Sequence, residues 1–167
     1  MHRKIEDVIN EVHKDMSQKN ALEFVEYLKA NNAKFHDSDN YFWHPTYKDK
    51  ELCIINIKIN DDGIATFYML FNNFPSAWIT SSVGENNSDC IEFSENECTK
   101  KIVWANVRPC EITGCGDCSP GICKTFFDKE FKNLCGYFLE FKNPNLKTME
   151  LMKRMIDEIK SDILKNA

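Results

Sequence analysis

Apolar residues recur every three or four positions near both ends of the chain, a spacing that predicts amphipathic helices. One helix is predicted over residues 3–15, and a second begins at a cap formed by Asn20 and ends at Asn31-Asn32. A long third helix opens after Asn143-Pro144, because Asn143 can cap it and proline suits its first turn. The apolar stripes contain Ile5, Val8, Ile9, Val12, Met16, Leu22, Val25, Leu28, Leu146, Met149, Met152, Ile156, Ile159 and Ile163.

The middle of the chain changes to an alternation of apolar and polar positions, which indicates β-strands. The clearest example is residues 52–59, which places Ile55, Ile57 and Ile59 on one face. A strong turn signal at 60–63, Asn-Asp-Asp-Gly, predicts a hairpin. Strands are also predicted at 64–71, 77–83, 102–107 and 135–141, with an irregular connection at 84–99.

Helices at both ends and hairpin-linked strands between them predict an α+β fold. We expect a twisted antiparallel sheet with two N-terminal helices and one long C-terminal helix packed on one face. A length of 167 residues suggests a single domain, 1–167, with a Cys-rich loop at 108–123. The sequence contains no Gly-rich loop between a strand and a helix, so it gives no support for nucleotide binding.

Charge and hydropathy narrow the class of partner. The formal net charge is −5, which argues against a nucleic-acid partner because such a surface needs a basic face. No run approaches the roughly 18 apolar residues that span a bilayer, so no membrane partner is expected. Acidic residues interrupt any signal-peptide core at the N-terminus, and we therefore expect a cytoplasmic protein. The sequence is compatible with a small-molecule ligand, and it does not indicate the oligomeric state.

The densest chemistry lies in RPCEITGCGDCSPGIC, residues 108–123. Its four thiols, Cys110, Cys115, Cys118 and Cys123, follow the spacing C-x4-C-x2-C-x4-C. Zinc takes four thiolates at about 2.3 Å, and a C-x2-C knuckle supplies two of them from one turn. A reducing cytoplasm also disfavours a disulfide framework. This pattern predicts a structural zinc site, with Cys135 as a reserve ligand.

Two alternatives stay open for the same thiols. Cys115 and Cys118 could act as a redox dithiol or sensor, or all the cysteines could be inert in an interaction protein. Cys53 lies in an apolar strand and is expected to be a small buried side chain. No histidine is joined to a cysteine by a nucleophile motif, so the sequence identifies no catalytic residue and favours a binding module over an enzyme.

An aromatic segment precedes the predicted hairpin and is a second candidate site. Tyr41, Trp43, His44 and Tyr47 fall within seven residues. Successive side chains on a strand point to opposite faces, so one set should be core and the other should face a groove. Aromatic walls with a histidine could hold a small ligand there. Packing of both faces under helices is the competing interpretation.

Residues 41–59 carry Trp43, Pro45 and Tyr47 before a Lys-rich turn and a strand, a layout that resembles the YdhG-like group of small α+β proteins. Some members of that group are described as iron chaperones, and the resemblance implies only a fold. The second half resembles uncharacterised small bacterial proteins with a Cys-rich loop. Cys110, Cys115 and Cys118 also match part of the ligand spacing of plant-type ferredoxins. The fourth ligand of that family comes much later in the chain, so an iron–sulfur cluster is disfavoured relative to zinc.

Overall fold

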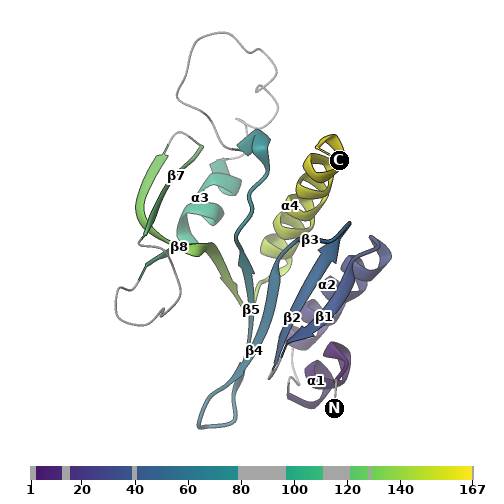
Figure 1. Cartoon of the computed structure of the whole chain (residues 1–167). Helices are drawn as coiled ribbons and strands as arrows, with labels where there is room; N and C mark the ends of the chain where they lie inside the picture. The colour runs from purple at the N-terminus through teal and green to yellow at the C-terminus, as the bar shows by residue number, and fades with distance from the viewer. Residues whose placement is uncertain are drawn as a thin grey trace, which may run out of the picture.

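The computed structural model describes residues 3–12, 16–38, 41–78, 97–110, 121–127 and 129–166. Within these ranges the chain forms four α-helices, one 3₁₀ helix and eight strands (Figure 1). The helices are α1 (Ile5–Val12), α2 (Met16–Ala30), α3 (Glu97–Ala105) and α4 (Leu146–Lys165), and the 3₁₀ helix is η1 (Ser76–Trp78). The strands are β1 (Lys34–Ser38), β2 (Phe42–Tyr47), β3 (Lys50–Glu51), β4 (Ile54–Ile59), β5 (Ala65–Phe71), β6 (Val107–Pro109), β7 (Ile122–Phe126) and β8 (Lys129–Lys142).

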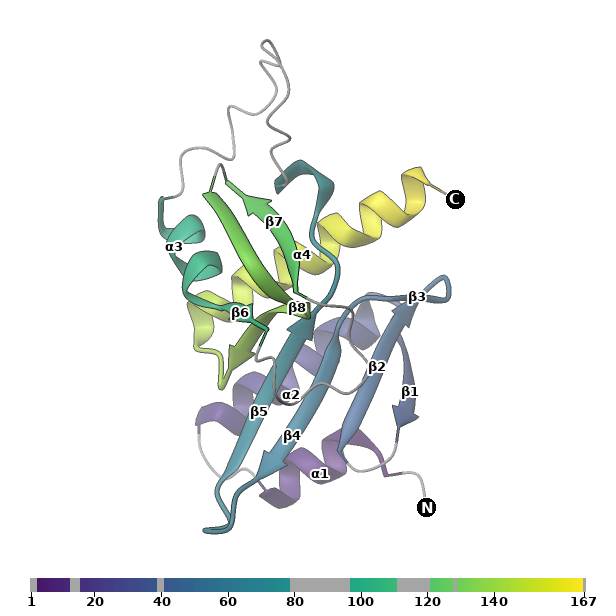
Figure 2. The same ribbon diagram turned by 60° about the vertical axis from the view of Figure 1, so that its left-hand side comes forward.

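The strands form one sheet in the order β1-β2-β4-β5-β8-β6, with β3 paired to β2 and β7 paired to β8. Every pairing is antiparallel. Helices α1, α2 and α4 lie on one face of the sheet (Figure 2). The α+β class and the antiparallel sheet are therefore confirmed.

The hydrophobic core lies between these three helices and the sheet. Four residues of the predicted α4 stripe, Met149, Met152, Ile156 and Ile159, are all at most 4% exposed, whereas Leu146 at the start of the helix is 61% exposed. Ile55 and Ile57 of β4 are buried as well, but Ile59 at the end of the same strand is 42% exposed, because the hairpin extends beyond the helices there. Cys53 is buried, as predicted, and burial raises the pKa of its thiol.

The hairpin between β4 and β5 turns where the sequence predicts. Gly63 donates its backbone N–H to the carbonyl of Asn60 at 2.9 Å, and the Asn60 side chain accepts from the N–H of Ile64 at 2.7 Å. Gly63 has a φ of 75°, a left-handed conformation that glycine adopts at little cost. The turn is consequently specified by its own residues.

The prediction of a strand at 102–107 is wrong. These residues instead form the end of α3 and the start of β6. A short apolar run does not distinguish a strand from a buried helical turn. Val103 is fully buried, the indole of Trp104 donates to the Phe126 carbonyl at 3.0 Å, and the Asn106 side chain donates to the Ile102 carbonyl at the helix end. Of the strand predicted at 77–83 and the connection at 84–99, residues 79–96 lie outside the described ranges.

Two predicted helix caps are also wrong. Asn20 lies inside α2, which begins at Met16, and its side chain is buried. Helix α4 is capped by Asn145, whose side chain accepts from the N–H of Thr148, rather than by Asn143. Asn143 takes a left-handed φ of 41°, and its side chain accepts from the N–H of Phe67 on β5 at 2.8 Å. Both asparagines therefore serve tertiary contacts instead of local ones.

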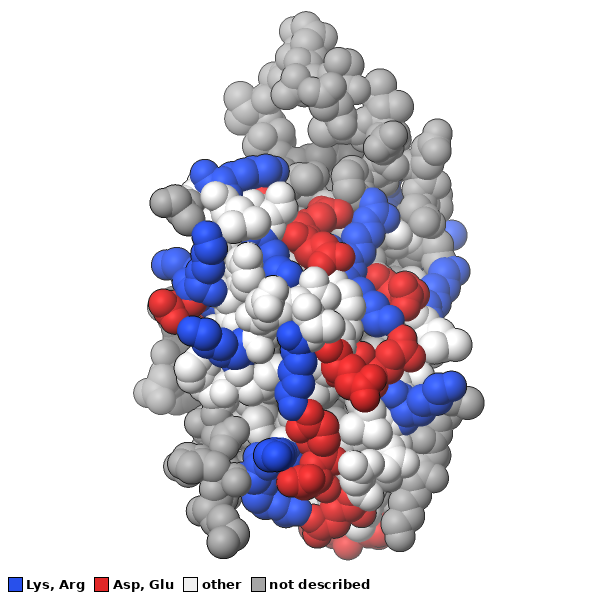
Figure 3. Space-filling view, turned by 90° about the vertical axis from the view of Figure 1, so that its right-hand side faces the viewer, with Lys and Arg blue, Asp and Glu red and all other residues white. Residues whose placement is uncertain are grey.

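Acidic and basic side chains are interspersed over the face seen in Figure 3, with no large field of one sign. Mixed charge of this kind is typical of a solvated surface. In the described part of the chain, no helix combines the length and the apolar character needed to cross a membrane.

Candidate functional site

The aromatic segment divides between the two faces of β2. Trp43 is 3% exposed, and its indole donates to the backbone carbonyl of Arg3 at 3.4 Å. Tyr47 points to the same side and is half-buried, with the Lys160 ammonium 4.9 Å from its ring centroid. His44 faces the opposite side. Because successive strand residues point apart, Trp43 and His44 cannot line one hollow.

Tyr41 and Trp43 have different surroundings although they are two residues apart. Tyr41 precedes β2 with a left-handed φ of 68°, and its side chain is 37% exposed. Trp43 adjoins a hollow of about 230 Å³ that Arg3, Lys29 and Phe35 also line. The four residues of the predicted pocket therefore do not gather around a common space.

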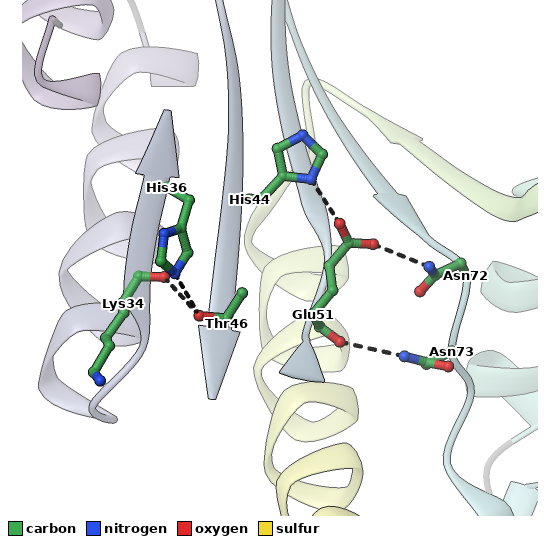
Figure 4. A network of polar contacts seen from close by, with 7 residues as sticks. All are labelled: Lys34, His36, His44, Thr46, Glu51, Asn72 and Asn73. Carbon is green, nitrogen blue, oxygen red and sulfur yellow. Dashed lines mark hydrogen bonds and ion pairs between the residues drawn. The ribbon is translucent and has the colours of Figure 1, made fainter. Parts of the chain in front are cut away.

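His44 belongs to a polar network that links β2, β3 and the end of β5 (Figure 4). Its Nδ1 lies 2.6 Å from Oε2 of Glu51, and Oε1 of Glu51 accepts from the Asn72 amide at 3.0 Å. The backbone carbonyl of Glu51 accepts from Asn73 at 3.2 Å. An ionised Glu51 requires a proton on Nδ1, which leaves Nε2 of a neutral His44 as an acceptor. This network fixes the orientation of the imidazole and braces strand β3.

His36 of β1 is paired with His44 of β2 in the sheet register, but its ring does not contact the His44 network. Its Nε2 lies 3.0 Å from the hydroxyl of Thr46, as Figure 4 shows. Among the described residues, no three His, Cys, Asp or Glu side chains form a group able to hold a metal ion. The two histidines are therefore held separately.

Two members of the predicted zinc quartet lie within the described ranges. Cys110 is half-buried and Cys123 is exposed, and neither forms a disulfide. Cys115 and Cys118 lie outside the described residues. Cys135, the reserve ligand, is 4% exposed on β8.

The chain positions Cys110 and Cys123 on opposite sides of β8. Pro109 of β6 and Ile122 of β7 both pair with Leu134, one on each edge of that strand. The backbone N–H of Cys110 donates to the carbonyl of Asn133 at 2.7 Å. Strands lie about 4.8 Å apart, so β6 and β7 are separated by roughly 10 Å. That separation is too long for a direct disulfide between Cys110 and Cys123.

A cationic hollow, which sequence reasoning missed, lies on the sheet face opposite buried Phe67 and Phe141. Its volume is about 500 Å³. The register of the sheet brings its charged side chains together. Tyr68 of β5 pairs with Lys142 of β8 on one side and with Asn56 of β4 on the other, and Lys58 lies two residues beyond Asn56 on the same face. Strand β6 adds Arg108 at the edge. The charged and aromatic side chains around the hollow are Lys58, Tyr68, Arg108, Glu140 and Lys142.

Among the described residues, three cations share this hollow with one carboxylate. Glu140 contacts Lys142 at 3.0 Å and Arg108 at 3.5 Å, and so holds both of them. The hydrogen bond from Glu140 and its charge raise the pKa of Lys142, which therefore stays protonated at neutral pH. The ammonium groups of Lys58 and Lys142 lie 5.1 Å and 5.5 Å from the centroid of the Tyr68 ring.

The described residues that line the hollow carry a formal charge of +2, in a chain whose net charge is −5. A concave surface of one sign concentrates ions of the opposite sign. Its members are far apart in the sequence, and lysines at exposed strand positions are common, so no local signal could have identified it. The arrangement can bind an anion, and we call it the cationic hollow.

No protein-family model, curated protein or solved structure matches this chain. The resemblances to YdhG-like proteins and to small bacterial proteins with a Cys-rich loop stay predictions. The geometry of the described residues is therefore the basis for a functional proposal.

Proposed function

We propose that this protein is a binding module for a small multivalent anion, which it takes in the cationic hollow. The observation that carries the proposal is the convergence of Lys58, Arg108 and Lys142 on one space, where Glu140 is the one carboxylate among the described residues. Hydrogen bonds from charged donors to an anion are stronger than neutral ones, and several together select for multiple negative charges.

The ligand class follows from the lining. Tyr68 contributes a phenol ring between two ammonium groups, and Arg108 contributes a planar donor fork that matches phosphate or carboxylate oxygens. Few apolar groups line the hollow, so we expect a compact polar anion such as a phosphorylated or polycarboxylate metabolite. The proposal needs no catalytic residue, and we keep a binding module as the function.

Isothermal titration calorimetry with inorganic pyrophosphate and with citrate tests this proposal and separates the two anion chemistries. We expect binding that weakens as salt rises, because the site is open to solvent. Lys58→Gln, Arg108→Gln and Lys142→Gln should each reduce the binding free energy by roughly 1.5–3 kcal/mol, the contribution of a hydrogen bond to a charged group.

Lys34→Gln is the matched control. Lys34 lies on β1, at the other edge of the sheet from β6, and its loss changes the net charge by the same amount. Affinity should be unchanged in this variant. If all four substitutions weakened binding equally, the attraction would be non-specific and the proposed site would be contradicted. The proposal would also be contradicted if neither anion bound.

A structural zinc site at Cys110, Cys115, Cys118 and Cys123 is the second part of the proposal, in a protein that we place in the cytoplasm. Its support is the spacing C-x4-C-x2-C-x4-C, because Zn²⁺ takes four thiolates. The positions of Cys110 and Cys123 on the two edges of β8 do not add to that support, because strands roughly 10 Å apart hold two cysteines farther apart than two thiolates at about 2.3 Å from one ion. In this proposal Cys115 and Cys118 supply two of the four thiolates from one C-x2-C turn.

Elemental analysis of protein purified under reducing conditions tests the zinc site. We expect one zinc per chain in the parent protein, loss of the metal in Cys118→Ser, and retention in Cys90→Ser, which lies outside the quartet. A metal-free parent protein with a Cys115–Cys118 disulfide that cycles with a dithiol reductant would favour the redox alternative instead. Absence of both would leave the cysteines inert.

A further inference from the structure

A second hollow lies between the β2–β3 turn and the last turns of α4. Its volume is about 330 Å³. Lys48 and Lys50 line it from the turn, and Ile159, Asp162 and Ile163 line it from the helix. It shares no residue with the cationic hollow.

Phe74, Ile159 and Ile163 form the apolar part of this hollow, and the polar Asn73 and Asn166 line it as well. Phe74 and Ile159 are 8% and 4% exposed, and Ile163 is half-buried at its edge. The Phe74 ring packs edge-on against Trp78, with centroids 5.3 Å apart, so its position is set by the core. Small-molecule sites in proteins are commonly preformed, apolar and equipped with a few polar groups at their rim.

Among the described residues the rim carries a formal charge of +1, because Lys48 and Lys50 outnumber its one carboxylate, Asp162. Asp162 accepts from the backbone N–H of Ser76 at 2.7 Å and from the Ser76 hydroxyl at 2.9 Å. Lys165 approaches the same carboxylate at 3.9 Å. These contacts orient the Asp162 carboxylate but leave its negative charge in place, so Lys48 and Lys50 together give the hollow an excess of one positive charge.

The turn that presents these lysines has a strained backbone. Lys48 and Asp49 have φ values of 47° and 60°, the left-handed conformation of a two-residue type I′ hairpin turn. Such turns favour Asn-Gly, and other residues in this conformation cost free energy. A lysine at the first turn position therefore sacrifices stability, which agrees with a role for its ammonium group at the hollow.

We propose that this hollow is a second binding site, for a small carboxylate with an aromatic or branched apolar tail. The tail occupies the space over Phe74, Ile159 and Ile163, and the carboxylate pairs with Lys48 and Lys50. The excess positive charge of the rim disfavours cationic ligands, and the apolar surface of Phe74, Ile159 and Ile163 disfavours the compact polyanions expected in the cationic hollow.

The test is a methyl-resolved NMR titration of the full chain with 3-phenylpropanoate, beside its neutral amide 3-phenylpropanamide. Saturable shifts should appear at the methyl groups of Ile159 and Ile163. The amide should bind about tenfold or more weakly, because it cannot form the charge-assisted hydrogen bonds. Lys48→Gln and Lys50→Gln are surface substitutions that should each weaken 3-phenylpropanoate binding by a similar factor.

Lys58→Gln is the control for this site and should leave 3-phenylpropanoate affinity unchanged, whereas Lys50→Gln should leave pyrophosphate affinity unchanged. The proposals for the two sites can therefore be contradicted independently of each other. Equal affinity for acid and amide, insensitivity to both rim substitutions, or the absence of saturable shifts at Ile159 and Ile163 would each overturn the proposal.

Discussion

The side-chain amide of Asn20 donates a 2.9 Å hydrogen bond to the backbone carbonyl of Pro144, across 124 positions of the chain. Asn20 is 5% exposed within α2, and Pro144 stands just before the cap of α4. This bond joins two helices at the point where the second one begins.

Replacing Asn20 by alanine should therefore destabilise the protein by about 1–3 kcal/mol, because it leaves the Pro144 carbonyl without this donor in a buried environment. Urea denaturation measures the difference. Asn10→Ala is the control: Asn10 accepts an exposed hydrogen bond from Gln18, and its loss should change stability by less than about 0.5 kcal/mol. Equal effects of the two variants would contradict a structural role for Asn20.

Ile156 is fully buried in α4. Ile156→Ala should lower the free energy of unfolding by roughly 2–5 kcal/mol, since it removes apolar contacts and leaves a cavity. Ile64, which is 62% exposed beside the hairpin turn, provides the comparison. Thermal unfolding should show little change for Ile64→Ala, and a similarly small change for Ile156→Ala would mean that the helix does not pack as described.

The strained turn between β2 and β3 predicts a stabilising substitution. Asp49→Gly relieves the cost of a side chain at φ 60° and should raise the free energy of unfolding by about 0.5–1 kcal/mol despite the added freedom of the unfolded chain. Denaturant titration measures the gain. A loss of stability would show that Asp49 makes a contribution that outweighs the strain.

Glu158 of α4 predicts a pH dependence. Burial raises the pKa of this carboxyl, and the nearby Arg154 guanidinium offsets only part of that effect. A carboxyl with a raised pKa in the folded state favours folding when protonated, and this contribution is lost as the pH rises through the folded pKa. Glu158→Gln removes that loss while keeping the shape of the side chain. Its stability relative to the parent protein should therefore increase as the pH rises from the pKa of an unfolded glutamate, about 4.3, through the higher folded pKa, and should then level off. Unfolding curves at several pH values test this, and a constant difference would contradict it.

Local sequence determined those elements whose stabilising contacts are themselves local. Asn60 and Gly63 form the hairpin turn with each other's backbone, and the α4 stripe buries Met152 and Ile156 wherever a sheet face meets it. The alternation around Trp43 likewise required Trp43 and His44 to face apart, whatever covered each face.

Tertiary structure decided the features whose partners lie far away in the sequence. Residues 102–105 are helical because Val103 and Trp104 find buried partners, although the run alone also fits a strand. Asn20 and Asn143 look like helix caps, yet each contacts a distant backbone group instead.

The cationic hollow is the clearest case. Lys58, Arg108 and Lys142 carry no shared motif, and only the register of β4, β5 and β8, with β6 at the edge, brings their charges together. Sequence periodicity specifies which face of a strand a side chain occupies, but long-range pairing specifies which strands become neighbours, and a site assembled across strands depends on that second choice.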